Sequence, residues 1–119
     1  MVADAKRDRV YVADPHNKRI EVFDTKGALI AKWPVPEWQR EGWSFQDLAI
    51  DPDAERIYLT SPATDEVLVY DLEGKKIAAL KPPPPNNLEG VSALALGKGK
   101  LYVVSAFADR IQAIDLRSP

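Results

Sequence analysis

Residues 2–33 read VADAKRDRVYVADPHNKRIEVFDTKGALIAKW, and residues 49–80 read AIDPDAERIYLTSPATDEVLVYDLEGKKIAAL. The two stretches align at a constant shift of 47 residues without a gap, and nine of the 32 aligned positions are identical. A third copy, KLYVVSAFADRIQAIDL, spans residues 100–116 and follows at a shift of 44. A period of this length is typical of repeat architectures, in which each unit has an apolar face that a neighbouring unit must cover.

Each copy contains short apolar segments that are rich in β-branched and aromatic residues and are separated by turn residues, which predicts β-strands. The segments DTKG and DLEG combine an Asp with a Gly three residues later and predict tight hairpins. The predicted strands fall in four equivalent sets: a leading strand at 47–50 and 92–96; a second at 10–13, 57–60 and 101–104; a third at 20–23, 67–70 and 111–114; and an outer strand at 29–33 and 76–80. Each unit is therefore predicted to be a four-stranded antiparallel meander.

In the second copy, Leu68 and Tyr70 alternate with Val67 and Val69, so both faces of the predicted sheet are apolar. Four-stranded meanders of about 40 to 45 residues that are covered on both faces are typical of β-propeller blades. The segments AIDPDAERIYL, VYVADPHNKRIEVFDTKG and VLVYDLEG resemble the NHL-type six-bladed β-propeller family. This resemblance implies an all-β fold across residues 1–119, with blades at about 2–33, 45–81 and 91–116, the third lacking its outer strand.

About three blades cannot close a ring, because propellers close with about four to eight. The end blades are as apolar as the middle one, and their polar Glu21 and Gln112 occupy one equivalent position, so they cannot cap opposite ends. We therefore expect the chain to associate with itself, as a homodimer that forms a six-bladed ring. The two copies would meet at two equivalent seams, where a seam is the interface between two successive blades, each joining the last blade of one copy to the first blade of the other. The alternative is that the missing blades belong to a longer parent chain.

The composition excludes several classes of protein. The chain has 119 residues, 45% hydrophobic and 29% charged, which is ordinary for one globular domain. Its net charge of -2, with 16 basic and 18 acidic residues throughout, argues against nucleic-acid binding. The sequence shows no signal peptide and no run apolar enough for membrane insertion, so we expect a soluble segment. The absence of cysteine excludes disulfides but leaves the compartment open.

As the family resemblance implies, the loops between second and third strands share one rim with the connections between blades. The candidate binding residues on this rim are Trp38, Trp43, Arg40, His16, Phe107, Asn86 and Asn87. Trp38 and Trp43 are the best candidates, because rigid aromatic side chains give large contact area at small entropic cost. For one or both, however, the favoured interpretation is that the ring plugs the top of a seam or covers the core of a blade. For Phe107, packing is favoured over ligand contact.

The residues that would carry catalysis or bind a metal are sparse. His16 is the single histidine, and a zinc or iron site needs further ligands, so a surface turn residue is favoured. The recurring Asp4, Asp51, Asp24, Asp71 and Asp115 are better explained as hairpin openers than as calcium ligands. No catalytic residue, metal ligand or cofactor is predicted.

The sequence favours a non-catalytic propeller scaffold that self-associates and presents its rim to a protein, peptide or glycan. The alternative is an enzyme of the metal-dependent propeller lactonase or lyase kind, for which only Asn86, Asn87, Glu89 and His16 suggest ligands. RNA binding is a weaker third possibility, because the rim mixes basic and acidic side chains.

Overall fold

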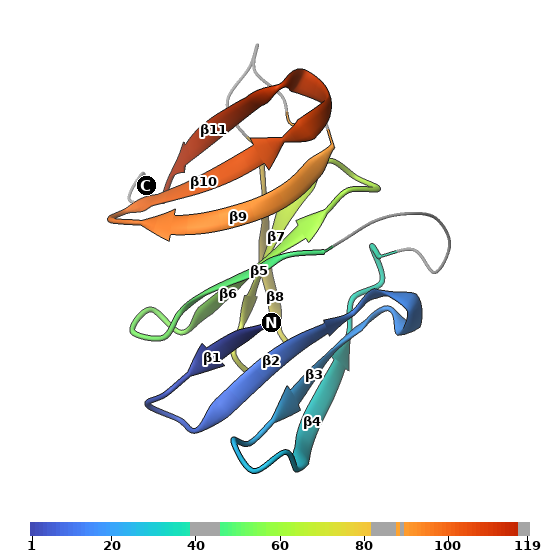
Figure 1. Ribbon diagram of the computed structural model, residues 1–119, viewed down its shortest axis with the longest axis vertical. Helices are drawn as coiled ribbons and strands as arrows, with labels where there is room; N and C mark the ends of the chain where they lie inside the picture. Colours follow the sequence, from blue (N-terminus) through green and yellow to red (C-terminus); the bar gives the residue numbers. More distant parts are fainter. Residues whose placement is uncertain (39–45, 82–87, 89, 117–119) are drawn as a thin grey trace.

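The computed structural model describes residues 1–38, 46–81, 88 and 90–116. The described residues form three antiparallel β-sheets stacked along the longest axis of the molecule (Figure 1). The first sheet holds β1 (Val2–Asp4), β2 (Arg9–Asp14), β3 (Arg19–Phe23) and β4 (Leu29–Pro34). The second holds β5 (Leu48–Asp51), β6 (Arg56–Ser61), β7 (Glu66–Asp71) and β8 (Lys76–Leu80). The third holds β9 (Val91–Gly97), β10 (Lys100–Ser105) and β11 (Arg110–Asp115).

Each sheet is a meander, in which strands that follow one another in the chain are also neighbours in the sheet. The prediction of blade-like antiparallel meanders is confirmed, and within the described residues the third sheet has three strands. Helical structure in the described part of the chain is restricted to two single 3-10 turns, η1 (Pro15–Asn17) and η2 (Ala106–Ala108). These turns join the second and third strands of the first and third sheets.

Four of the five recurring aspartates open hairpins, as predicted. Asp24 Oδ1 accepts hydrogen bonds from the N–H groups of Lys26 and Ala28, both at 2.9 Å. Asp71 Oδ1 accepts the equivalent bonds from Glu73 and Lys75, also at 2.9 Å. Asp4 and Asp51 accept from the backbone of their own hairpins in the same way. These bonds satisfy turn N–H groups that would otherwise lack a partner.

The repeat extends to the unusual backbone conformations in the turns. Lys18, Asp65 and Asp109 occupy equivalent positions, and all three have positive φ. Asp8 and Glu55 form a second such set, and in the third copy the equivalent residue is Gly99 with φ +73°. Because most residues avoid positive φ, the same left-handed turns in different residue types show that the fold of the unit imposes them.

Two hydrophobic cores lie between the three sheets. The first core, between the first and second sheets, contains Tyr11, Ile20, Leu68 and Tyr70. The second core, between the second and third sheets, contains Val67 and Val69 together with residues of β9, β10 and β11. The alternation of Leu68 and Tyr70 with Val67 and Val69 therefore buries both faces of the second sheet, which confirms the prediction from the sequence.

Candidate functional site: two open sheet faces and the loop rim

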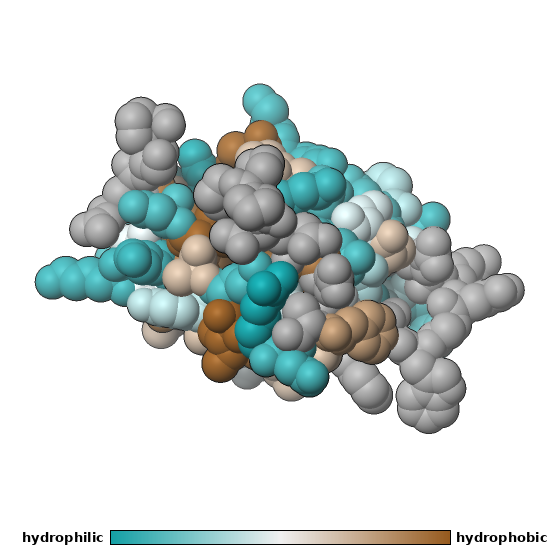
Figure 2. Space-filling model, turned by 90° about the horizontal axis from the view of Figure 1, so that it is seen from above, coloured by the Kyte–Doolittle hydropathy of each residue, from teal (hydrophilic) through white to brown (hydrophobic). Residues whose placement is uncertain are grey.

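Each sheet has a leading face, which is turned toward the preceding sheet, and a trailing face, which is turned toward the following one. Within the described residues, the trailing face of the third sheet has no sheet beyond it (Figure 1). Figure 2 views the molecule from that side and shows apolar patches among hydrophilic ones. The trailing face of the third sheet is formed by Ala93, Ala95, Tyr102, Val104, Ile111 and Ala113.

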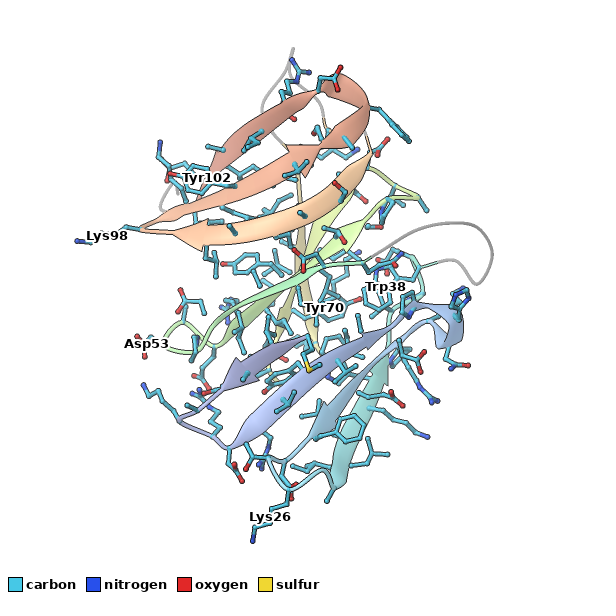
Figure 3. All side chains as sticks on the ribbon, in the orientation of Figure 1. Lys26, Trp38, Asp53, Tyr70, Lys98 and Tyr102 are labelled. Atoms are coloured by element: carbon cyan, nitrogen blue, oxygen red, sulfur yellow. The ribbon has the colours of Figure 1, made fainter. Side chains whose placement is uncertain are left out.

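Equivalent residues show what a following sheet does to a trailing face. Tyr11 and Tyr58 are 2% and 6% exposed beneath the following sheet, whereas the equivalent Tyr102 is 41% exposed (Figure 3). Ile20 and Val67 are fully buried, whereas the equivalent Ile111 is 69% exposed. Tyr102 and Ile111 are as apolar as their equivalents although none of the described sheets packs on them, so this face has the composition of a buried face.

The leading face of the first sheet is the second open face, formed by Val10, Val12, Glu21 and Phe23. Its valines are half-buried, whereas their equivalents in the second and third sheets, Ile57 with Leu101 and Leu59 with Val103, are fully buried. Glu21 lies on this open face, but the equivalent Gln112 faces the second core, where its Oε1 accepts a hydrogen bond from Ser105 Oγ at 2.8 Å. The expectation that these two residues cannot cap opposite ends is therefore confirmed.

The outer strands provide an internal control for these comparisons. Ile30 in β4 is 43% exposed, and the equivalent Ile77 in β8 is 44% exposed although its sheet has neighbours on both sides. Exposure at this position therefore does not depend on a neighbouring sheet. The exposure of Tyr102 and Ile111 does depend on one, because their equivalents are buried only where a sheet follows.

The loops between second and third strands lie on one side of the molecule, on the right in Figure 1, together with the described ends of the connections between sheets. Backbone hydrogen bonds join these segments: Val35 N–H donates to Lys18 O at 2.7 Å, and Ala106 N–H donates to Gly90 O at 3.0 Å. Gly90 N–H also donates to Asp65 Oδ1 at 3.0 Å. These hydrogen bonds join the loops and the described ends of the connections into one loop rim, the arrangement that the family resemblance implies.

Trp38 does not contribute a free surface to this rim. Its side chain is 1% exposed in the first core, and its Nε1–H donates a 2.8 Å hydrogen bond to Thr60 O of β6. The ring lies between the first and second sheets near the rim (Figure 3). The structure therefore places Trp38 where the favoured interpretation put it, as a plug at the top of the seam, and not among the rim residues available to a ligand.

The other candidate rim residues are spread rather than gathered. His16 is exposed in η1, the turn that joins β2 and β3 on the rim side of the first sheet. Phe107, in η2 of the third sheet, is 83% exposed, and its ring packs so closely over Gly90 that a Cβ there would lie 2.8 Å from Phe107 Cδ2. Trp43, Arg40, Asn86 and Asn87 lie outside the described residues.

An ion pair closes the first core beside Trp38. Lys76 Nζ lies 2.5 Å from Glu37 Oε2. Burial, the largest single influence, favours the protonated form of Glu37, but the hydrogen bond and charge of Lys76, together with a backbone hydrogen bond, outweigh it and hold the pKa of that carboxyl below its usual value. Burial, with the nearby charge of Glu37, raises the pKa of Tyr70 to about 12. Tyr70 therefore stays neutral at physiological pH and packs on Trp33, with ring centroids 4.7 Å apart.

The opposite edge of the molecule carries two clefts that the sequence did not predict. The cleft between the first and second sheets has a volume of about 440 Å³ and is lined by Arg9 and Tyr11 among others. The cleft between the second and third sheets, of about 500 Å³, is lined by the equivalent Arg56 and Tyr58. Because equivalent residues line both, the clefts follow from the wedge shape of the seams.

Charged residues tie the hairpins together across the first of these clefts. The carboxylate of Asp4 is fully buried and lies 2.8 Å from Arg7 Nη1. Burial would raise the pKa of Asp4, but the hydrogen bond and charge of Arg7 hold it below its usual value. Arg7 Nη2 also lies 3.4 Å from Glu55 Oε1, and Arg7 Nη1 donates a hydrogen bond to Pro52 O. Beside it, Lys6 Nζ lies 2.8 Å from Asp53 Oδ1. The buried carboxylate of Asp4 therefore holds Arg7 in place, and Arg7 links the first sheet to the second.

Within the described residues, no three histidine or acidic side chains gather closely enough to hold a metal ion. The described part of the chain also contains no helix long and apolar enough to cross a membrane. The sequence matches no protein-family model and no curated protein.

Proposed function

We propose that this chain is a non-catalytic β-propeller module, similar to the NHL type, that completes a ring by self-association and presents its loop rim to a protein, peptide or glycan. The observation that supports this proposal is the loss of cover from Tyr102 and Ile111, whose equivalents are buried in both preceding sheets. Leaving such side chains in water forfeits hydrophobic stabilisation that each internal seam gains.

The two open faces are of complementary kinds. Among the residues that the structure describes, no sheet follows the third sheet and none precedes the first. When the third sheet of one copy stacks on the first sheet of a second copy, Tyr102 and Ile111 meet Val10, Val12 and Phe23. In the internal seams, residues at the equivalent positions already pack in this way. Two copies related by a two-fold axis then form two such seams and six sheets in a ring.

The rim side of this ring is the surface that remains for a macromolecular ligand. Some of its described charges are paired locally, as between Arg19 and Asp14 at 3.3 Å and between Glu66 and Lys81 at 4.0 Å, and acidic and basic residues are mixed along it. A locally balanced rim does not provide the basic surface that nucleic acid needs. It fits a ligand that is recognised through shape and hydrogen bonds, such as a peptide or a glycan.

Molar mass in solution tests this proposal. We expect light scattering on the purified chain to give twice the 13.2 kDa of one copy. Dilution should then return the mass toward one copy, because association depends on concentration. A well-folded species that stays at 13.2 kDa at every concentration would overturn the proposal.

A further inference from the structure

The outer edge of β11 differs from the equivalent edges in the other two sheets. β3 pairs with β4, and β7 pairs with β8, so their outer edges are covered. Within the described residues, β11 pairs with β10 alone and forms the edge of the third sheet. This edge is distinct from the open sheet faces, and a ring built by face-to-face stacking leaves it uncovered.

Alternate backbone groups of β11 point toward this open edge. Leu116 N–H donates to Gly99 O at 2.9 Å, so the alternate residues Gln112 and Ile114 also direct their N–H and C=O groups toward β10. Ile111 and Ala113 therefore direct theirs outward. The second sheet confirms this parity, because Asp71 N–H donates to Lys75 O at 2.9 Å on the β8 side. Val69 and Val67 lie two and four residues before Asp71 in β7, so their N–H and C=O groups also point toward β8. They are the equivalents of Ala113 and Ile111.

The strands that cover the equivalent edges show which side chains fit. Trp33 lies opposite Ile20, and Leu80 lies opposite Val67, so a large apolar residue occupies the place that would face Ile111. Two small residues, Ala31 and Ala78, lie opposite Val22 and Val69, the equivalents of Ala113. An added strand is therefore expected to carry a small residue and, two positions later, a large apolar one.

Arg110 supplies a charge preference at the end of this edge. Its equivalent in the second sheet, Glu66, lies 4.0 Å from Lys81, the residue that follows β8. Its equivalent in the first sheet, Arg19, contacts Asp14 at 3.3 Å and Glu21 at 3.0 Å. In the third sheet the places of those two carboxylates are taken by Ser105 and Gln112. Arg110 is exposed and has the sign opposite to Glu66, so it favours an acidic residue in the place of Lys81.

We propose that the outer edge of β11 binds an extended peptide segment by strand addition, antiparallel to β11. The segment has a small residue opposite Ala113, a large apolar residue opposite Ile111 and an acidic residue next in the chain, beside Arg110. The outward N–H and C=O groups of β11 supply affinity, and the three side-chain positions supply specificity. This site goes beyond the proposed ring and does not depend on it.

The chain itself provides the probe peptides. The segment 75–81, KKIAALK, is the strand that covers the equivalent edge of β7, and the same peptide with Lys81→Glu carries the acidic residue that we expect Arg110 to prefer. Titration of each fluorescently labelled peptide with the intact protein is expected to give about tenfold tighter binding of the Glu peptide, because a repulsive exposed pair becomes an attractive one. An Arg110→Glu protein should reverse the order.

N-methylation distinguishes strand addition from nonspecific contact. In the peptide, the N–H of the residue equivalent to Leu80 is expected to bond to β11, whereas that of the Ala79 equivalent points away. Methylating the Leu80 nitrogen should weaken binding at least about tenfold, and methylating the Ala79 nitrogen should leave it within about twofold. Equal effects of the two methyl groups, or no saturable binding of the Glu peptide, would overturn the proposal. A protein that stays monomeric yet binds the Glu peptide would retain this site while refuting the ring.

Discussion

Chains carrying Ile111→Glu or Val12→Glu are each expected to be monomeric alone and to form a heterodimer when mixed. Ile111 lies on the open trailing face of the third sheet, and Val12 lies on the open leading face of the first. Stacking would bury either carboxylate in an apolar seam, which costs several kcal/mol because the charge loses its water. We expect association of each variant with itself to weaken at least about 100-fold.

The mixture restores one seam because each seam uses one face of each kind. In a homodimer of either variant, both seams contain the substituted face. In the mixed pair, one seam contains both substitutions and the other contains neither. Light scattering should therefore show two monomers when the variants are separate and a species of twice the mass when they are combined.

Ile30→Glu is the matched control for this experiment. Ile30 is as exposed as Ile77, whose sheet already has two neighbours, so position 30 lies outside the proposed seam. This variant should associate like the unaltered chain. A Val12→Glu or Ile111→Glu variant that associates with itself as tightly as the unaltered chain would show that the seam does not use that face.

Trp38→Ala is expected to cause the largest loss of stability from a single side chain, about 3–5 kcal/mol in the free energy of unfolding. The substitution leaves a cavity where a 1%-exposed indole packs between the first two sheets. It also removes the Nε1–H bond to Thr60 O. Urea denaturation of variant and unaltered protein, at one chain concentration, measures the difference.

Phe107→Ala is the aromatic control on the same rim. Its ring is 83% exposed, so removing it should change the free energy of unfolding by no more than about 0.5 kcal/mol. Equal stability of the Trp38→Ala variant and the unaltered protein would contradict the placement of Trp38 in the core. That result would return Trp38 to the candidates for ligand contact.

The meander fold could be predicted from the sequence because its signals are local and repeated. Asp24 with Gly27, and Asp71 with Gly74, marked the hairpins, and the structure shows the expected turn bonds at both. The alternation of Leu68 and Tyr70 with Val67 and Val69 indicated a sheet buried on both faces. Such patterns depend on neighbours in the chain, which a sequence displays directly.

The placement of single side chains was harder to predict because it depends on contacts between sheets. Two tryptophans in one connection suggested a binding surface, but the position of the Trp38 ring is set by the gap between β-sheets and by Thr60 O. The left-handed turns at Lys18 and Glu55 have no glycine at these positions that would have indicated a positive φ. The two clefts at the hairpin edge likewise depend on how the sheets diverge, which no local pattern encodes.

Crosslinking between Lys98 and Lys6 of different copies tests the head-to-tail ring most directly. These residues lie at hairpins that would face each other across the new seam, as Lys6 and Asp53 do across the first seam at 2.8 Å. Lys98 and Asp53 lie on the same edge of the molecule (Figure 3). The chain has no cysteine, so Lys98→Cys and Lys6→Cys each introduce a single reactive thiol, and Lys6→Cys also removes the exposed ion pair with Asp53.

A short bismaleimide should join the two variants when they are mixed and should join neither variant to itself. Mass spectrometry of the product identifies the linked positions. A linked pair of positions 98 and 6 from different copies is the result that the head-to-tail ring predicts. Efficient linkage of the Lys98→Cys variant to itself, with none in the mixture beyond that, would contradict it and show that like faces meet.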